Sequence, residues 1–106
     1  MTLDQEYQKT IDDQRAYLLK LQDDFNKKCE DAKTRAQAKL KQIPDGDKEG
    51  REEVLKDQKA ELEAALTVLK NEVDHSTRGT MRKLEEIVRK KEVQILAGLE
   101  DQLSKL

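Results

Sequence analysis

Aromatic side chains and cysteines are the scarcest features of this sequence. Only 3% of its 106 residues are Phe, Tyr or Trp, and Cys29 is the only cysteine. So few aromatic residues leave little apolar bulk for a thick core, and a single cysteine excludes an internal disulfide framework. The chain opens with MTLDQEYQKT, which lacks the basic start and apolar stretch of a signal peptide. We therefore expect a cytoplasmic protein.

Long apolar runs and an excess of one charge sign are also missing. No stretch approaches the roughly 20 apolar residues of a membrane span, so we expect no membrane partner. The formal net charge is -2, whereas a dedicated polyanion binder needs a sustained basic surface. What the chain has is charge of both signs, with 42% Asp, Glu, Lys and Arg. This composition is typical of a long helix or coiled coil.

The apolar residues of the first half recur with a helical period. From Leu18 onward they are separated by steps of 3, 4, 4, 3, 4, 4 and 3 residues, an eleven-residue (hendecad) repeat. Thr2 and Gln5 have the spacing of a capping box, and Pro44 disfavours a helix beyond Ile43, so we predict a helix over about 3–43. The expected buried row is Leu3, Tyr7, Thr10 with Ile11, Gln14, Leu18, Leu21, Phe25, Cys29, Ala32, Ala36, Leu40 and Ile43.

The second half has the same repeat in two adjacent rows. One row is Leu62, Val73, Leu84, Ile95 and Leu106, and the other is Leu55, Leu66, Thr77, Val88 and Leu99. We predict a second helix over about 47–105. The stretch DHSTRGT is weaker and allows a bend near 76–80, because Gly79 costs about 1 kcal/mol relative to Ala in a helix. Since both rows stay in phase across it, a continuous helix is favoured.

The segment Pro44-Asp45-Gly46 is short enough to be the turn of a hairpin over residues 44–46. The helices then run antiparallel, and the numbers of facing residues add to about 91. In this register the basic stretch 27–41 faces the acidic stretch 50–64, and acidic residues 1–13 face the basic stretch 78–90. Opposite charges meet at both ends, which selects the antiparallel orientation. We predict an all-α fold with two long antiparallel helices, a helical hairpin or antiparallel coiled coil, as a single domain over 1–106.

The second helix outlasts the first in this register, and its last part is the most apolar segment of the chain. Such a face is covered by a second copy, by another helical protein, or by the segment itself folding back at Gly79. We favour a second copy, which gives a homodimer and a dimeric helical bundle. The predicted contact row is Leu84, Val88, Ile95, Leu99, Leu103 and Leu106.

Catalytic and metal-binding patterns are weak in this sequence. Glu72 and His75 have the Glu-x-x-His spacing of di-iron helix bundles, but helical rotation from Val73 turns His75 toward solvent. In the predicted register Cys29 and His75 are also far apart, so they form no nucleophile and base pair. We expect no enzyme, no catalytic residues, no cofactor and no metal.

The function predicted from these patterns is that of a non-enzymatic coiled-coil protein, a structural or adaptor module acting through protein–protein contacts. One alternative is a small helical-bundle protein that binds a metal or another ligand. A second alternative is weak nucleic-acid binding through the basic stretches 27–41 and 78–91, although counterion release there is opposed by neighbouring acidic residues.

Overall fold

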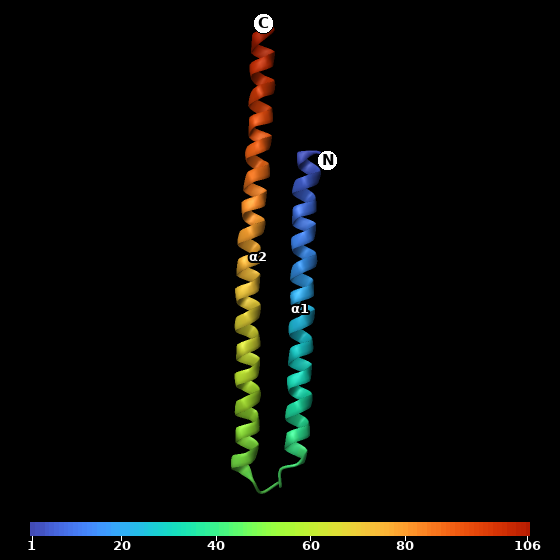
Figure 1. Cartoon of the computed structure of the whole chain (residues 1–106), viewed down its shortest axis with the longest axis vertical. Coiled ribbons are helices and arrows are strands. Elements are labelled where there is room, and N and C mark those ends of the chain that lie inside the picture. Colours follow the sequence, from blue (N-terminus) through green and yellow to red (C-terminus); the bar gives the residue numbers. More distant parts are fainter. The chain divides into compact units, whose positions relative to one another are not determined.

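The computed structural model describes all residues 1–106 and consists of two α-helices (Figure 1). Helix α1 spans Leu3–Lys41 and helix α2 spans Lys48–Ser104, and no residue lies in a strand. The predicted all-α helical hairpin with two long antiparallel helices is confirmed. Helix α2 runs without interruption through residues 74–80, so Gly79 lies inside a helix.

The end of α1 shows how the proline stops the helix. The last helical residue is Lys41, two positions before the predicted end at Ile43. The amides of Gln42 and Ile43 donate hydrogen bonds to carbonyls three residues earlier, at 3.1 and 3.2 Å. This spacing is the tightened last turn that often closes a helix. Pro44 cannot continue the helix because it has no N–H group.

The start of α2 is fixed by a side-chain cap. The backbone N–H of Asp47 donates to the carbonyl of Pro44 at 3.0 Å, which closes the connection. The Asp47 side chain then accepts a hydrogen bond from the N–H of Gly50 at 3.0 Å. An Asp that accepts from the third helical residue satisfies one of the free amides at a helix start. Asp47 is therefore the N-cap of α2.

The contacts between α1 and α2 fall into two compact units. The turn unit comprises residues 18–73 and contains the connection between the helices. The terminal unit comprises residues 1–17 and 74–106. In each unit a segment of α1 packs against a segment of α2.

The core of the turn unit is narrow and lies on α1. Its buried residues are Leu21, Ala32 and Ala36, and Ala32 retains only 1% of its accessible surface. Alanine lets the two helix backbones approach closely. Every position of the predicted α1 row from Leu18 to Ile43 is buried or half-buried. From α2 the half-buried residues facing this core are Val54, Gln58, Leu62, Ala65, Leu69 and Val73.

Only one of the two apolar rows expected on α2 is shielded by packing. In the turn unit Leu62 and Val73 are half-buried, whereas Leu55 and Leu66 remain exposed. The terminal unit repeats this difference, because Leu84 is half-buried while Thr77 and Val88 are exposed. The second row therefore lies on the flank of the packed face in each unit.

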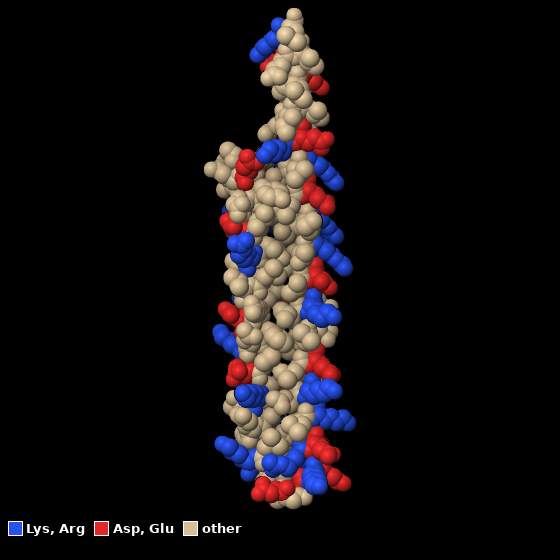
Figure 2. All heavy atoms as spheres, turned by 180° about the vertical axis from the view of Figure 1, so that it is seen from behind, with Lys and Arg blue, Asp and Glu red and all other residues tan.

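Charged side chains of both signs lie along the helix surfaces (Figure 2). In the turn unit Arg35 of α1 forms an ion pair with Glu61 of α2. This pair joins the basic stretch 27–41 to the acidic stretch 50–64, as the predicted register requires. Both side chains are about half exposed, so the pair contributes at most about 1 kcal/mol.

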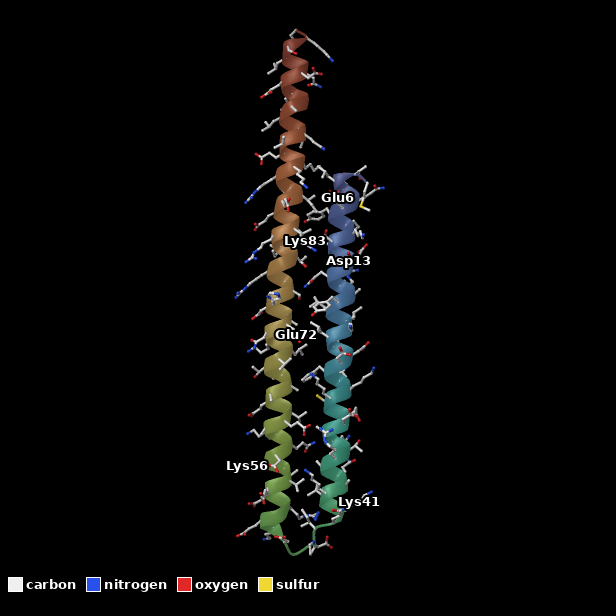
Figure 3. The ribbon with its side chains drawn as sticks, in the orientation of Figure 1. Glu6, Asp13, Lys41, Lys56, Glu72 and Lys83 are labelled. Atoms are coloured by element: carbon white, nitrogen blue, oxygen red, sulfur yellow. The ribbon has the colours of Figure 1, made fainter.

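In the terminal unit the helix segments are antiparallel, with the numbers of paired residues close to the predicted sum. The side-chain amide of Gln14 donates to the hydroxyl of Ser76 at 3.2 Å. Lys83 of α2 lies between the levels of Glu6 and Asp13 of α1 (Figure 3). The three side chains line one shallow pocket of this unit. Acidic groups of α1 thus face basic groups of α2.

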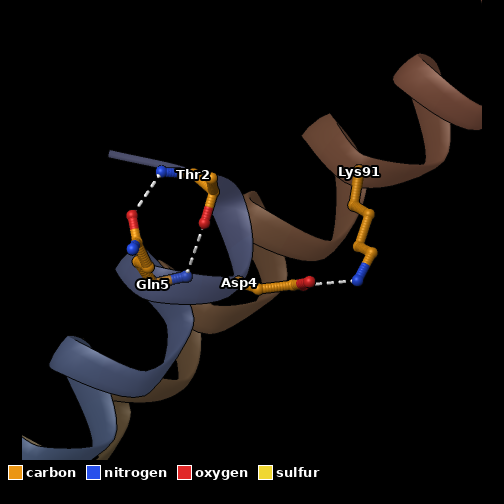
Figure 4. A network of polar contacts seen from close by, with 4 residues as sticks. All are labelled: Thr2, Asp4, Gln5 and Lys91. Carbon is orange, nitrogen blue, oxygen red and sulfur yellow. Dashed lines mark hydrogen bonds and ion pairs between the residues drawn. The ribbon is translucent and has the colours of Figure 1, made fainter.

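The first turn of α1 carries the predicted capping box (Figure 4). The N–H of Thr2 donates to Oε1 of Gln5 at 2.9 Å, and the N–H of Gln5 donates to the hydroxyl of Thr2 at 3.1 Å. Beside it, Lys91 of α2 forms an ion pair with Asp4. The start of α1 is therefore anchored to α2 at Lys91.

Candidate interaction surface

The part of α2 beyond Lys91 has no partner helix in the terminal unit. All residues from 92 to 106 are exposed, and in Figure 1 α2 continues past the N-terminal end of α1. We call residues 92–106 the C-terminal segment. On the face drawn in Figure 2 it carries few charged side chains. This segment is the largest stretch of the chain in which no residue is shielded by α1.

Five of the six predicted contact residues are exposed, and they include every predicted residue of the C-terminal segment. The fully exposed Leu106 ends the chain, and the other four retain half or more of their accessible surface: Val88 54%, Ile95 56%, Leu99 50% and Leu103 68%. Leu84 differs because it is half-buried. The structure thus assigns Leu84 in part to the packing between α1 and α2.

Met81 belongs to the same exposed face but was missed by the sequence prediction. It retains 51% of its accessible surface. Met81 lies seven residues before Val88, and residues seven apart share a face of an α-helix. The helical period could therefore have identified Met81. Met81 was not predicted because it follows the stretch around Gly79, where the apolar pattern is weak, and because its neighbours in the sequence are polar.

Along the sequence, two clusters of opposite charge lie on either side of Ile95. The basic cluster is Arg89, Lys90 and Lys91, and the acidic cluster is Glu100 and Asp101. Lys90 pairs with Glu86 at 3.7 Å, and Lys105 pairs with Asp101 at 3.2 Å, each within one turn of α2. Arg89 and Glu100 are exposed and form no ion pair.

The turn unit has an apolar groove of its own, with a volume of about 350 Å³. It is lined by Phe25 and Cys29 of α1 and by Leu55, Leu62 and Leu66 of α2. Cys29 is half-buried and unpaired, close to the buried packing role expected for it. The exposed row of α2 forms one wall of this groove.

A polar pocket of about 260 Å³ lies in the terminal unit. Its hydrogen bonds join Gln14 of α1 to hydroxyl groups of Ser76, Thr77 and Thr80 on α2. Gly79 also lines the pocket. The weak stretch 74–80 therefore packs through polar groups that pair with one another.

Glu72 and His75, the residues with di-iron spacing, are both exposed. No group of three or more His, Cys, Asp or Glu side chains that could hold a metal ion is present. The basic stretch 27–41 contains Arg35, which pairs with Glu61, and Lys91 at the edge of the stretch 78–91 pairs with Asp4. Some cations of both stretches are thus neutralised locally.

Neither helix is apolar over a length sufficient to cross a membrane. Comparison with protein-family models, with curated proteins and with solved structures finds no match to this chain.

Proposed function

We propose that this protein is a non-enzymatic structural or assembly module that acts through protein–protein contacts. Its leading partner is a second copy of itself, bound through residues 84–106 to form a homodimer. Another helical protein is the alternative partner for the same surface. The observation that carries the proposal is the exposed apolar row from Val88 to Leu106, most of which lies on a segment that α1 does not cover.

The hairpin buries few of its side chains. Its only buried residues are Leu21, Ala32 and Ala36. Covering apolar surface stabilises an association by roughly 25 cal/mol for each Å² removed from water. A partner that covers Ile95, Leu99 and Leu103 therefore supplies burial that the single chain lacks. Contacts between amphipathic helices of this kind are a coiled-coil type of interaction.

The proposal also places this module in the cytoplasm. The lone Cys29 supports this, because one half-buried thiol suits a reducing compartment. The non-enzymatic role is supported by the character of the surface, in which apolar side chains occupy the positions that a partner would contact. Neither the metal-binding nor the nucleic-acid alternative has a comparable feature in its favour.

The experiment is a measurement of molar mass by size-exclusion chromatography with light scattering over a range of concentrations. We expect the wild-type chain to approach twice the mass of a single chain as its concentration rises. Leu99→Asp should raise the dissociation constant at least about tenfold, a change of about 1.4 kcal/mol, because it places a charge in the apolar contact. Gln94→Asp is the matched control, since helical rotation puts position 94 about 140° from Leu99.

Equal masses for the wild type and Leu99→Asp at every concentration would contradict self-association through this row. Circular dichroism of both variants checks that the helices persist. A comparable loss in the Gln94→Asp control would attribute the effect to added charge rather than to the apolar row.

A further inference from the structure

The charges beside the exposed apolar row are arranged so that they complement a reversed copy of the same segment. The basic cluster of residues 89–91 precedes Ile95, and the acidic cluster of residues 100–101 follows it at a similar distance. In a parallel pair of these segments each cluster would meet its own copy, and like charges would repel. In an antiparallel pair each cluster meets the opposite sign.

Helical rotation places the two unpaired charges on one edge of the row. Arg89 and Glu100 are eleven residues apart, which is close to three full turns, so they lie on the same side of α2. Each follows an exposed member of the apolar row, Val88 and Leu99 respectively. In an antiparallel pair with two-fold symmetry, corresponding edges of the two helices lie side by side. Arg89 of one copy therefore lies beside Glu100 of the other.

The apolar residues agree with the same arrangement when the two-fold axis passes near Ile95. Leu106 of one copy then lies opposite Leu84 of the other. Leu99 falls between Val88 and Ile95, and Leu103 falls beside Val88, as knobs into the holes of the facing helix. All six residues of the predicted contact row take part. The half-buried Leu84 remains partly accessible to the second copy.

We propose that a second copy of this chain docks on α2 in antiparallel orientation, with the two-fold axis near Ile95 and two reciprocal Arg89–Glu100 ion pairs. This inference rests on the proposed function and specifies its partner, orientation and register.

The orientation is tested by a distance between two spin labels. In a Cys29→Ala background, Ser104→Cys gives one labelling site per chain, on an exposed position turned away from the apolar row. In the antiparallel dimer the two sites are separated by about 30 Å along the helix axis, from 1.5 Å rise per residue. In a parallel dimer the two sites would lie at the same level along the axis, so the distance would be shorter and would consist only of the separation across the two helices. The short distance would overturn the inference but leave the dimer, and hence the proposed function, intact.

The ion pair is tested by charge reversal. Arg89→Glu should raise the dimer dissociation constant about tenfold, because it puts like charges together twice in the dimer. Adding Glu100→Arg in the same chain should restore most of the affinity. Lys90→Glu is the matched control, because Lys90 lies on the side of α2 away from the row. Failure of the second change to rescue the first would contradict the proposed register. A wild-type chain that is monomeric at every concentration would contradict self-association, and the alternative partner of the proposed function, another helical protein, would then take its place.

Discussion

Gln14 of α1 and Thr80 of α2 are joined by a hydrogen bond in the terminal unit, in which the Thr80 hydroxyl donates to Oε1 of Gln14 at 2.8 Å. The amide nitrogen of Gln14 donates in turn to the hydroxyls of Ser76 and Thr77, at 3.2 and 3.4 Å. These residues form one polar level of the packing between α1 and α2 in this unit. One polar residue at such a level specifies register at a cost in stability. This polar level therefore holds α1 in its register on α2 in this unit.

A double-mutant cycle on Gln14 and Thr80 measures this contribution. Thr80→Val keeps the shape of the side chain and removes the donor, and we expect it to cost about 0.5 to 1.5 kcal/mol. Gln14→Leu removes the acceptor as well. Because the two groups share one hydrogen bond, the double variant should lose less than the sum of the single losses. The free energy of unfolding in urea checks this, and strictly additive losses would show that the bond does not couple the helices.

Enlarging Ala32 should destabilise the turn unit. Its side chain retains 1% of its accessible surface, so Ala32→Leu forces α1 and α2 apart, at a cost of about 1 to 3 kcal/mol. Ala38 is an exposed alanine of the same helix, and Ala38→Leu should change stability by less than about 0.5 kcal/mol. Urea unfolding of the two variants provides the comparison. Equal stabilities would mean that the helices do not approach closely at Ala32.

Two glycines of α2 should respond differently to alanine. A Cβ at Gly79 meets no atom within 4 Å, so Gly79→Ala should raise the free energy of unfolding by up to about 1 kcal/mol through helix propensity. A Cβ at Gly50 would lie 2.6 Å from Oδ2 of Asp47. Gly50→Ala therefore displaces the N-cap side chain, and the loss of its hydrogen bond, worth about 1 kcal/mol, offsets the gain.

Urea unfolding of the two glycine variants measures both effects. A clear gain in stability for Gly50→Ala would show that Asp47 caps α2 equally well from another rotamer. No gain for Gly79→Ala would indicate that the polar pocket beside it tolerates no added methyl group.

The packed face of α1 could be predicted from the sequence because its apolar steps of 3 and 4 residues leave only one stripe. On α2 the apolar spacing predicts the exposed row as readily as the half-buried row. The row that packs beside Leu62 and Leu84 contains Ala65 and Ser76, whose small or polar side chains give a weak apolar signal. Leu55 and Leu66 give a strong apolar signal although both side chains are exposed. The hydrophobic period therefore predicts an apolar stripe on α2, but it does not predict which row of that stripe α1 covers.

The position of the candidate interaction surface could be predicted from the sequence, because the place of Pro44 sets the lengths of α1 and α2. Pro44 divides the chain unequally, so an antiparallel partner ends before α2 does. The half-burial of Leu84 was not predictable, since its row continues without a break into the exposed Ile95. The row changes from half-buried to exposed near Lys91, whose ion pair with Asp4 joins α2 to the first turn of α1.

The C-terminal segment should gain protection from hydrogen exchange only when the protein associates. Its helix is supported by α1 as far as Lys91 and then continues for 13 residues to Ser104, about the length at which isolated helices are marginal in water. In the monomer its amides should therefore exchange quickly, and in the antiparallel dimer slowly. Exchange measured by mass spectrometry at several concentrations should show rising protection over residues 95–104, with none in Leu99→Asp.

Core amides near Ala32 serve as the internal control, because the packing of the turn unit does not depend on the partner. If the molar mass doubled while this segment stayed unprotected, the dimer contact would have to lie elsewhere, and the exposed Leu55 and Leu66 beside the turn-unit groove would be the surface to substitute next.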